Sequence, residues 1–183
     1  MDIRDTAIPA VKLLTPRRFP DQRGWFGETY NRSAFAAAGI DLDFVQDNQS
    51  YSAQAGTVRG LHFQRPPFAQ DKLVRVLRGA IFDVAVDLRR DSPSYGRHVA
   101  VELSAASGQQ LLVPAGFAHG FCTLEPDTEV AYKVTAHYAP DHDGGLLWND
   151  PDLAIFWPVG LDAALLSEKD RVLPRLAELS TPF

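Results

Sequence analysis

Two histidines lie in stretches of sequence where an imidazole could exchange protons or bind a ligand. His62 belongs to GTVRGLHFQ (residues 56–64), and His119 belongs to VPAGFAHGF (residues 113–121). Histidine is the side chain whose ordinary pKa places its charge change near neutral pH, so it serves as acid, base and metal ligand. A single histidine in a strand is nevertheless more often a hydrogen-bonded structural residue. The two positions are therefore candidates whose role depends on the residues around them.

Both stretches resemble the two sequence motifs of the cupin superfamily of jelly-roll barrels. The second motif is complete from Gly108 to His119. The first reaches His62, but Gln64 replaces its second histidine and no glutamate follows at the expected offset. A metal site of this kind needs three or four ligands, and only two are present. The departure predicts a pocket without a metal, in which the histidines are free for proton transfer or hydrogen bonding.

Alternation with a period of two residues predicts that strands position these side chains. The expected strands recur about every ten residues, with Gly and Pro between them, a spacing typical of sandwiches and barrels. They cover residues 11–14, 25–30, 44–52, 58–64, 72–77, 81–89, 98–104, 108–114, 121–125 and 129–138. The runs 72–77 and 81–89 are separated by Arg78 and Gly79, and we expect them to form a hairpin.

Helix is expected only at the periphery of the molecule. Residues 33–40 predict one short helix, with Ser33 as its cap and Gly39 at its end. Residues 162–179 are helix-prone but interrupted by Pro174. The predicted fold class is all-β: one domain over residues 1–183, an antiparallel double-sheet jelly-roll barrel with short peripheral helices.

Composition excludes several classes of function. The chain has 18 basic and 23 acidic residues, a formal net charge of −5, which disfavours a nucleic-acid partner because such proteins need a basic field. No signal peptide or long uncharged apolar window is present, so we expect no membrane partner and a cytoplasmic location. The one cysteine, Cys122, is expected to be a buried, inert thiol.

Eight blocks of the chain, in order, resemble the dTDP-4-dehydrorhamnose 3,5-epimerase family. They are FPDQRGWFGETYN (19–31), DFVQDNQSYS (43–52), VRGLHFQ (58–64), DKLVRVLRGAIFDVAVDLRRDSPSYG (71–96), VPAGFAHGF (113–121), AYKVTAHYAP (131–140), LLWNDPDLAIFWP (147–158) and LSEKD (166–170). The resemblance covers the chain from about Pro16 to Asp170, which makes it far more specific than either histidine motif alone.

The resemblance implies a cofactor-free reaction at two carbons beside a ketone. Enzymes of this family invert carbons 3 and 5 of dTDP-4-keto-6-deoxy-glucose, giving dTDP-4-keto-L-rhamnose for dTDP-L-rhamnose biosynthesis. The chemistry needs a base on one ring face, a stabiliser for the enolate oxygen and an acid on the other face. By resemblance His62 is the base, Asp170 orients it, Lys72 faces the enolate oxygen and Tyr132 is the proton donor.

Two of these roles have a competing interpretation in the residues themselves. Ser167 and Asp170 have the spacing of a helix-capping pattern, and without the resemblance a cap is the favoured role for Asp170. Lysine on a strand usually faces solvent, but Lys72 alternates with Val74 and Val76, which indicates a pocket wall.

The resemblance also implies a set of substrate-binding residues. Arg23, Arg59 and Lys169 match the cations of the family's diphosphate site. The family's polar contacts to nucleotide and sugar match Glu28, Gln46, Asn48 and His119. Tyr138 matches the aromatic residue that stacks on thymine. Alternation over 129–138 places Tyr138 on the same strand face as Tyr132. Asp143 stands where the family has a longer glutamate. Alternation also places Arg59 opposite His62, so either a bend at Gly60 redirects it or it serves elsewhere.

The family's habit of exchanging strands predicts a homodimer, with an N-terminal strand covering a sheet edge. Three other functions stay open at this point. They are a single-carbon epimerase of an unusual deoxysugar pathway, a sugar-binding cupin without catalysis, and a metal-dependent cupin.

Overall fold

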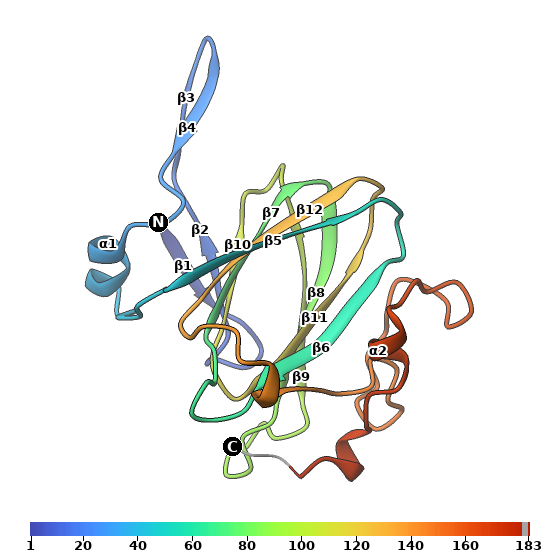
Figure 1. Ribbon diagram of the computed structural model, residues 1–183. Helices are drawn as coiled ribbons and strands as arrows, with labels where there is room; N and C mark the ends of the chain where they lie inside the picture. Colours follow the sequence, from blue (N-terminus) through green and yellow to red (C-terminus); the bar gives the residue numbers. More distant parts are fainter. Residues whose placement is uncertain (181–182) are drawn as a thin grey trace.

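Two antiparallel sheets face each other in the computed structural model, which describes residues 1–180 and Phe183 (Figure 1). Across the larger sheet the strands are β1 (Asp2–Asp5), β2 (Lys12–Thr15), β10 (Gln110–Val113), β7 (Lys72–Arg78), β12 (Thr128–Val134) and β5 (Gln46–Ser52). Across the smaller sheet they are β13 (Asp143–Gly145), β6 (Val58–Gln64), β11 (Phe117–Thr123), β8 (Ala80–Asp87) and β9 (His98–Ser104). The all-β double-sheet barrel expected from the sequence is confirmed.

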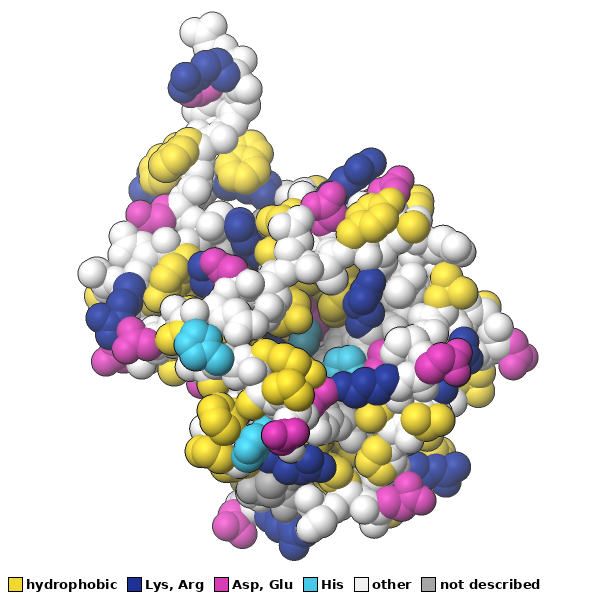
Figure 2. Space-filling view, in the orientation of Figure 1, with side chains coloured by type: hydrophobic (Ala, Val, Ile, Leu, Met, Phe, Trp, Pro, Cys, Tyr) yellow, Lys and Arg dark blue, Asp and Glu magenta, His cyan; other side chains and the backbone are white. Residues whose placement is uncertain are grey.

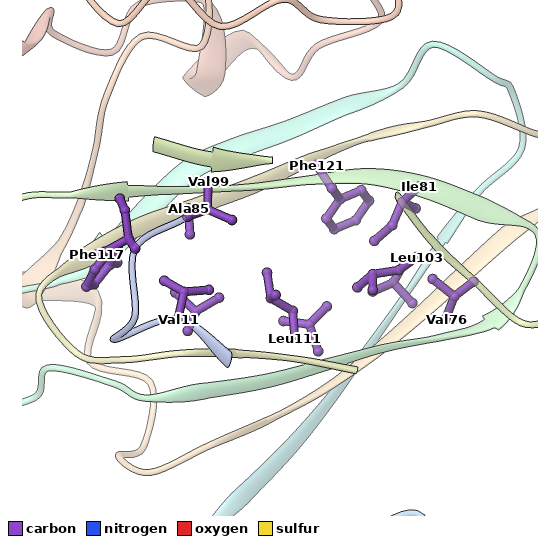
Figure 3. Close-up of a cluster of buried hydrophobic side chains, with 13 residues drawn as sticks. Val11, Val76, Ile81, Ala85, Val99, Leu103, Leu111, Phe117 and Phe121 are labelled. Atoms are coloured by element: carbon purple, nitrogen blue, oxygen red, sulfur yellow. The ribbon is translucent and has the colours of Figure 1, made fainter. Parts of the chain in front are cut away.

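The core lies between the two sheets because alternate residues of each strand point inward. Val76 of β7 comes from the larger sheet, and Ile81 and Ala85 of β8 come from the smaller one (Figure 3). The opposite face of β8 is also buried, because Val84 and Val86 pack beneath the C-terminal segment. That second layer explains why β8 is buried on both of its faces.

The expected hairpin between residues 72–77 and 81–89 is wrong. β7 pairs with β10 and β12, whereas β8 pairs with β11 and β9. The chain changes sheet at Gly79, where φ is +77° and a Cβ atom would lie 2.3 Å from the Thr128 hydroxyl. An alternating pattern shows that a strand has one apolar face but does not show which strand pairs with it. Here β7 and β8 lie in different sheets, and their apolar faces meet across the barrel.

The short helices lie outside the barrel, as expected, but their limits differ from the prediction. α1 spans Arg32–Ala37, and Asn31 rather than Ser33 caps it, its side-chain oxygen accepting from the Ala34 amide at 3.1 Å. Gly39 follows the helix with φ of +85°, as predicted. In residues 162–179 helix is confined to α2 (Glu168–Arg171) and one 3₁₀ turn, η2 (Leu176–Glu178).

A two-stranded hairpin, β3 (Arg18–Asp21) and β4 (Gly24–Gly27), projects well away from the barrel (Figure 1). Its apolar side chains Trp25 and Phe26 are 55% and 72% exposed. Cys122, by contrast, is buried in β11 as expected, and burial raises the pKa of its thiol to about 11.

Candidate active site

A cavity of about 500 Å³ opens between the two sheets. Its walls come from both sheets and from the C-terminal segment: Ser50, Thr57, Val58, Arg59, His62, Lys72, His119, Phe121, Tyr132, Leu165, Leu166, Ser167, Lys169 and Asp170. A second cavity of about 220 Å³ shares His62, Lys72, Tyr132 and Lys169 with it. On the face shown in Figure 2, histidine and basic side chains gather around this hollow.

An irregularity in β6 brings Arg59 and His62 to the same cavity. On β11, His119 lies opposite His62 and Phe121 lies opposite Arg59, so three steps along β6 face only two along β11. The extra residue is a β-bulge, which reverses the alternation on one strand. It is centred on Gly60, whose φ is +125° and whose Cβ atom would lie 2.6 Å from the Gly120 Cα. Of the two possibilities that the sequence left for Arg59, the structure shows the bend at Gly60.

His62 and Asp170 form a close pair although 108 residues separate them. Asp170 Oδ1 lies 2.6 Å from His62 Nε2, and its Oδ2 accepts from the Gly60 amide at 3.3 Å. Burial raises the Asp170 pKa, but the hydrogen bond and charge of His62 outweigh this and leave that pKa below its ordinary value. Ser167 caps α2 by accepting from the Asp170 amide at 3.1 Å. Capping and pairing therefore coexist, one using the Asp170 backbone and the other its side chain.

Lys72 and Tyr132 reach the cavity from the sheet opposite His62. The Lys72 side chain is buried, and its Nζ donates to the His62 carbonyl at 3.3 Å. Burial lowers the pKa of Lys72 to about 8, against the opposing effect of the Asp143 and Asp83 charges. Burial raises the pKa of the Tyr132 hydroxyl, and Arg59 acts in the opposite direction. Base and acid candidates thus come from facing sheets.

His119 is held by a residue that the sequence did not single out. Its Nε2 lies 2.5 Å from Asp83 Oδ1, and both side chains are buried. The available signal was the alternation of β8, because Asp83 is a charged residue on the face that Ile81 and Ala85 share. Ser50 was also missed, although it continues the alternate polar positions Gln46 and Asn48 into the cavity.

A polar group forms the outer end of the site. Lys169 donates to the Asp143 carboxylate, and the Tyr138 hydroxyl lies 3.5 Å from Asp143 Oδ2. Gln46 accepts from the Tyr138 amide at 3.1 Å and donates to Asn48 at 2.8 Å. The predicted strand 129–138 ends earlier, at Val134. Tyr138 therefore lies beyond the strand, 57% exposed at the rim, and the shared face predicted from alternation does not apply to it.

Two predicted binding residues lie outside this cavity. Arg23 sits in the turn of the projecting hairpin, where its side chain is 89% exposed and bonded to Asp21 at 2.6 Å. Glu28 follows that hairpin and accepts from the Asn31 side chain at 3.1 Å. The structure of one chain does not bring these two residues to His62.

Gln64, which replaces a cupin ligand, has a different task. Its amide donates to the carbonyls of Phe68 and His137 at 2.7 and 3.2 Å and accepts from the Ala139 amide at 2.8 Å. These bonds tie together the loops beneath the cavity. Within residues 1–180 and Phe183, no three His, Cys, Asp or Glu side chains are grouped as a metal site would require. Nor do the helices of that part include one long and apolar enough to span a bilayer.

Comparison with known proteins was consistent across sequence and structure. Residues 5–178 match the family described as dTDP-4-dehydrorhamnose 3,5-epimerase. A protein of that name from Sinorhizobium fredii is 55% identical over 183 residues, covering 100% of this chain and 93% of the relative. The Bacillus anthracis enzyme, solved with TDP and PPi bound, is 55% identical with a TM-score of 0.92, covering 95% of this chain and 98% of the other. The Legionella pneumophila enzyme, solved with dTDP-4-keto-L-rhamnose, is 42% identical with a TM-score of 0.93, covering 98% and 94%.

Proposed function

We propose that this chain, which belongs to the dTDP-4-dehydrorhamnose 3,5-epimerase family, converts dTDP-4-dehydro-6-deoxy-D-glucose to dTDP-4-dehydro-L-rhamnose. The observation that carries the proposal is the facing arrangement of Tyr132 and the His62–Asp170 pair, whose carboxylate is buried, across one cavity, with Lys72 beside them. The reaction is a proton exchange at two carbons, with no net oxidation or reduction.

His62 is the base in this proposal. Asp170 accepts at Nε2, so the ring's other nitrogen, Nδ1, is the atom that takes the proton from carbon 5 and then from carbon 3. The electron pair of each broken C–H bond forms the double bond to carbon 4, and the carbonyl π pair moves onto the ketone oxygen. Between the two carbons, His62 releases its proton to solvent and Tyr132 regains one from solvent. A carboxylate with 3% exposure steadies the imidazolium that forms, because charge-assisted hydrogen bonds are strong where water is excluded.

Lys72 stabilises the enolate oxygen. Its ammonium is fixed in place by the bond to the His62 carbonyl, so it needs little reorganisation when charge develops. Tyr132 then delivers a proton from the opposite ring face, which inverts the carbon. Burial raises the pKa of its hydroxyl further above neutral pH, so the proton that it must donate is present.

The outer cavity accommodates the nucleotide end of the substrate. Tyr138 offers an exposed ring for stacking on the base, and Arg59 and Lys169 supply positive charge for the diphosphate. Gln46 and Asn48 supply amide groups beside it, and His119 contacts the sugar. Asp143 already holds Lys169 and lies near Tyr138, so we assign it to positioning those two groups at the nucleotide end.

We further propose a cytoplasmic homodimer with exchanged strands. The projecting hairpin exposes Trp25 and Phe26, and apolar surface of that kind is normally covered by a partner. In a dimer the hairpin would carry Arg23 and Glu28 to the cavity of the second chain. Mixing Arg23→Ala and His62→Asn chains tests this: each alone is impaired, and exchange of subunits should restore about a quarter of the wild-type rate. No recovery on mixing would contradict it.

Proton NMR of the substrate incubated with the pure protein in heavy water tests the reaction itself. We expect deuterium at both C3 and C5, and none with His62→Asn. His98→Asn is the matched control, because His98 lies on β9 outside both cavity walls. Exchange at one carbon alone would establish the single-carbon epimerase instead. No exchange at either carbon would leave a sugar-binding cupin, and a tightly bound divalent ion would establish the metal-dependent alternative.

A further inference from the structure

Asp83 is a buried charged residue next to the cavity that the proposed reaction does not use. Its side chain has no solvent exposure, and Oδ1 lies 2.5 Å from His119 Nε2. Its second oxygen, Oδ2, is buried without a hydrogen-bond partner among the residues the structure describes. A buried carboxylate costs free energy unless it is paired. A carboxylate with only one of its two oxygens hydrogen-bonded, next to an active site, therefore requires an explanation.

We propose that Asp83 is a positioning residue, which fixes the ring of His119 for substrate binding. The inference rests on the proposed epimerase function. It adds a second His–Asp pair to the site, behind the wall that the substrate touches.

The argument for His119 is geometric. A carboxylate oxygen only accepts hydrogen bonds, so the contact with Asp83 requires the proton on Nε2. The neutral ring then presents Nδ1 as an acceptor to whatever occupies the cavity, which His119 lines. A sugar hydroxyl is a donor of the matching kind. Without the carboxylate, the ring could turn or change tautomer and would offer a donor where the substrate needs an acceptor.

Asp87 provides an internal comparison on the same strand face. It is as deeply buried as Asp83, but Arg89, Ser92 and Ser94 bond to its carboxylate at 2.6–2.9 Å. Asp87 therefore has a structural role at the far end of β8, which makes Asp87→Asn a matched control for the loss of a buried carboxylate.

The experiment compares the ¹⁵N NMR spectra of the His119 ring in wild type, Asp83→Asn and Asp87→Asn, assigned with a His119→Gln variant. We expect a proton on Nε2 in wild type and in Asp87→Asn, and a mixture of tautomers in Asp83→Asn.

A wild-type His119 ring protonated on Nδ1 would overturn the orienting role, and this result needs no variant to fold. A ring that stays protonated on Nε2 in Asp83→Asn as fully as in wild type would overturn it as well. Absence of exchange in wild type would instead refute the epimerase function, and the NMR readout of His119 would still stand as an independent test.

Discussion

Replacing Lys72 by methionine should stabilise the protein while it impairs catalysis. Burial lowers the Lys72 pKa from its ordinary value of 10.5 to about 8. At neutral pH that lowering corresponds to about 3 kcal/mol of unfolding free energy lost by holding the ammonium in the cavity wall. Methionine has a similar length and no charge, so Lys72→Met recovers that free energy. For a chain of this size the gain is a rise in Tm of about 6–12 °C.

The stability difference between Lys72→Met and wild type should shrink as the pH rises. Between pH 8 and 10.5 the unfolded chain binds a proton at this position that the folded chain does not, so wild-type stability rises with pH relative to the variant. The advantage of Lys72→Met should be about 3 kcal/mol at pH 7 and fall below about 1 kcal/mol at pH 10. Urea unfolding of both proteins at the two pH values measures it.

Lys133→Met is the control for this experiment. Lys133 lies on β12, 30% exposed and bonded to Asp47, so its loss should change stability by less than about 1 kcal/mol. Lys72→Met should also slow deuterium exchange by about 10²–10³-fold, the usual cost of one oxyanion donor. A variant no more stable than wild type at pH 7, or a difference that does not shrink by pH 10, would refute the reasoning.

Three further outcomes follow from the site. Tyr132→Phe should retain exchange at C5 and lose inversion, measured by NMR in heavy water; full epimerisation by this variant would remove Tyr132 from the mechanism. Asp170→Asn should slow exchange by about 10²-fold or more, because His62 loses a buried partner for its cation; wild-type initial rates would contradict this. Gly60→Ala should cost at least about 2 kcal/mol in urea unfolding, since its Cβ would meet the Gly120 Cα at 2.6 Å; unchanged stability would argue against the bulge.

Much of the barrel could be predicted because alternation reports burial directly. The strands 58–64 and 98–104 were predicted with their observed limits. Partners were harder to predict, since the pattern of a strand is the same whether its neighbour lies beside it or across the barrel, as β7 and β8 show. β1, β3 and β13 were missed because they are short and rich in charged residues, Pro or Gly, so no alternating apolar pattern stands out in them.

For the site, the resemblance indicated the residues and the local patterns did not show how they would meet. Lys72 was selected by the resemblance, alternation favoured a pocket wall for it, and it lines the cavity. The pairing of His62 with Asp170 was expected only from the resemblance, because it depends on docking of a distant segment that no local pattern records. Alternation puts Asp83 on one face of β8 with Ile81 and Ala85, but its contact with His119 depends on how β8 and β11 pair.

That distant docking has a consequence for how the molecule becomes active during synthesis. The last strand of the described residues ends at Gly145, yet the partner of His62 is residue 170. The segment between them also covers the outer apolar face of β8. Turnover thus reports that the C-terminal segment has been made and has docked, and a chain cut short after β13 would lose that cover and leave His62 without a partner.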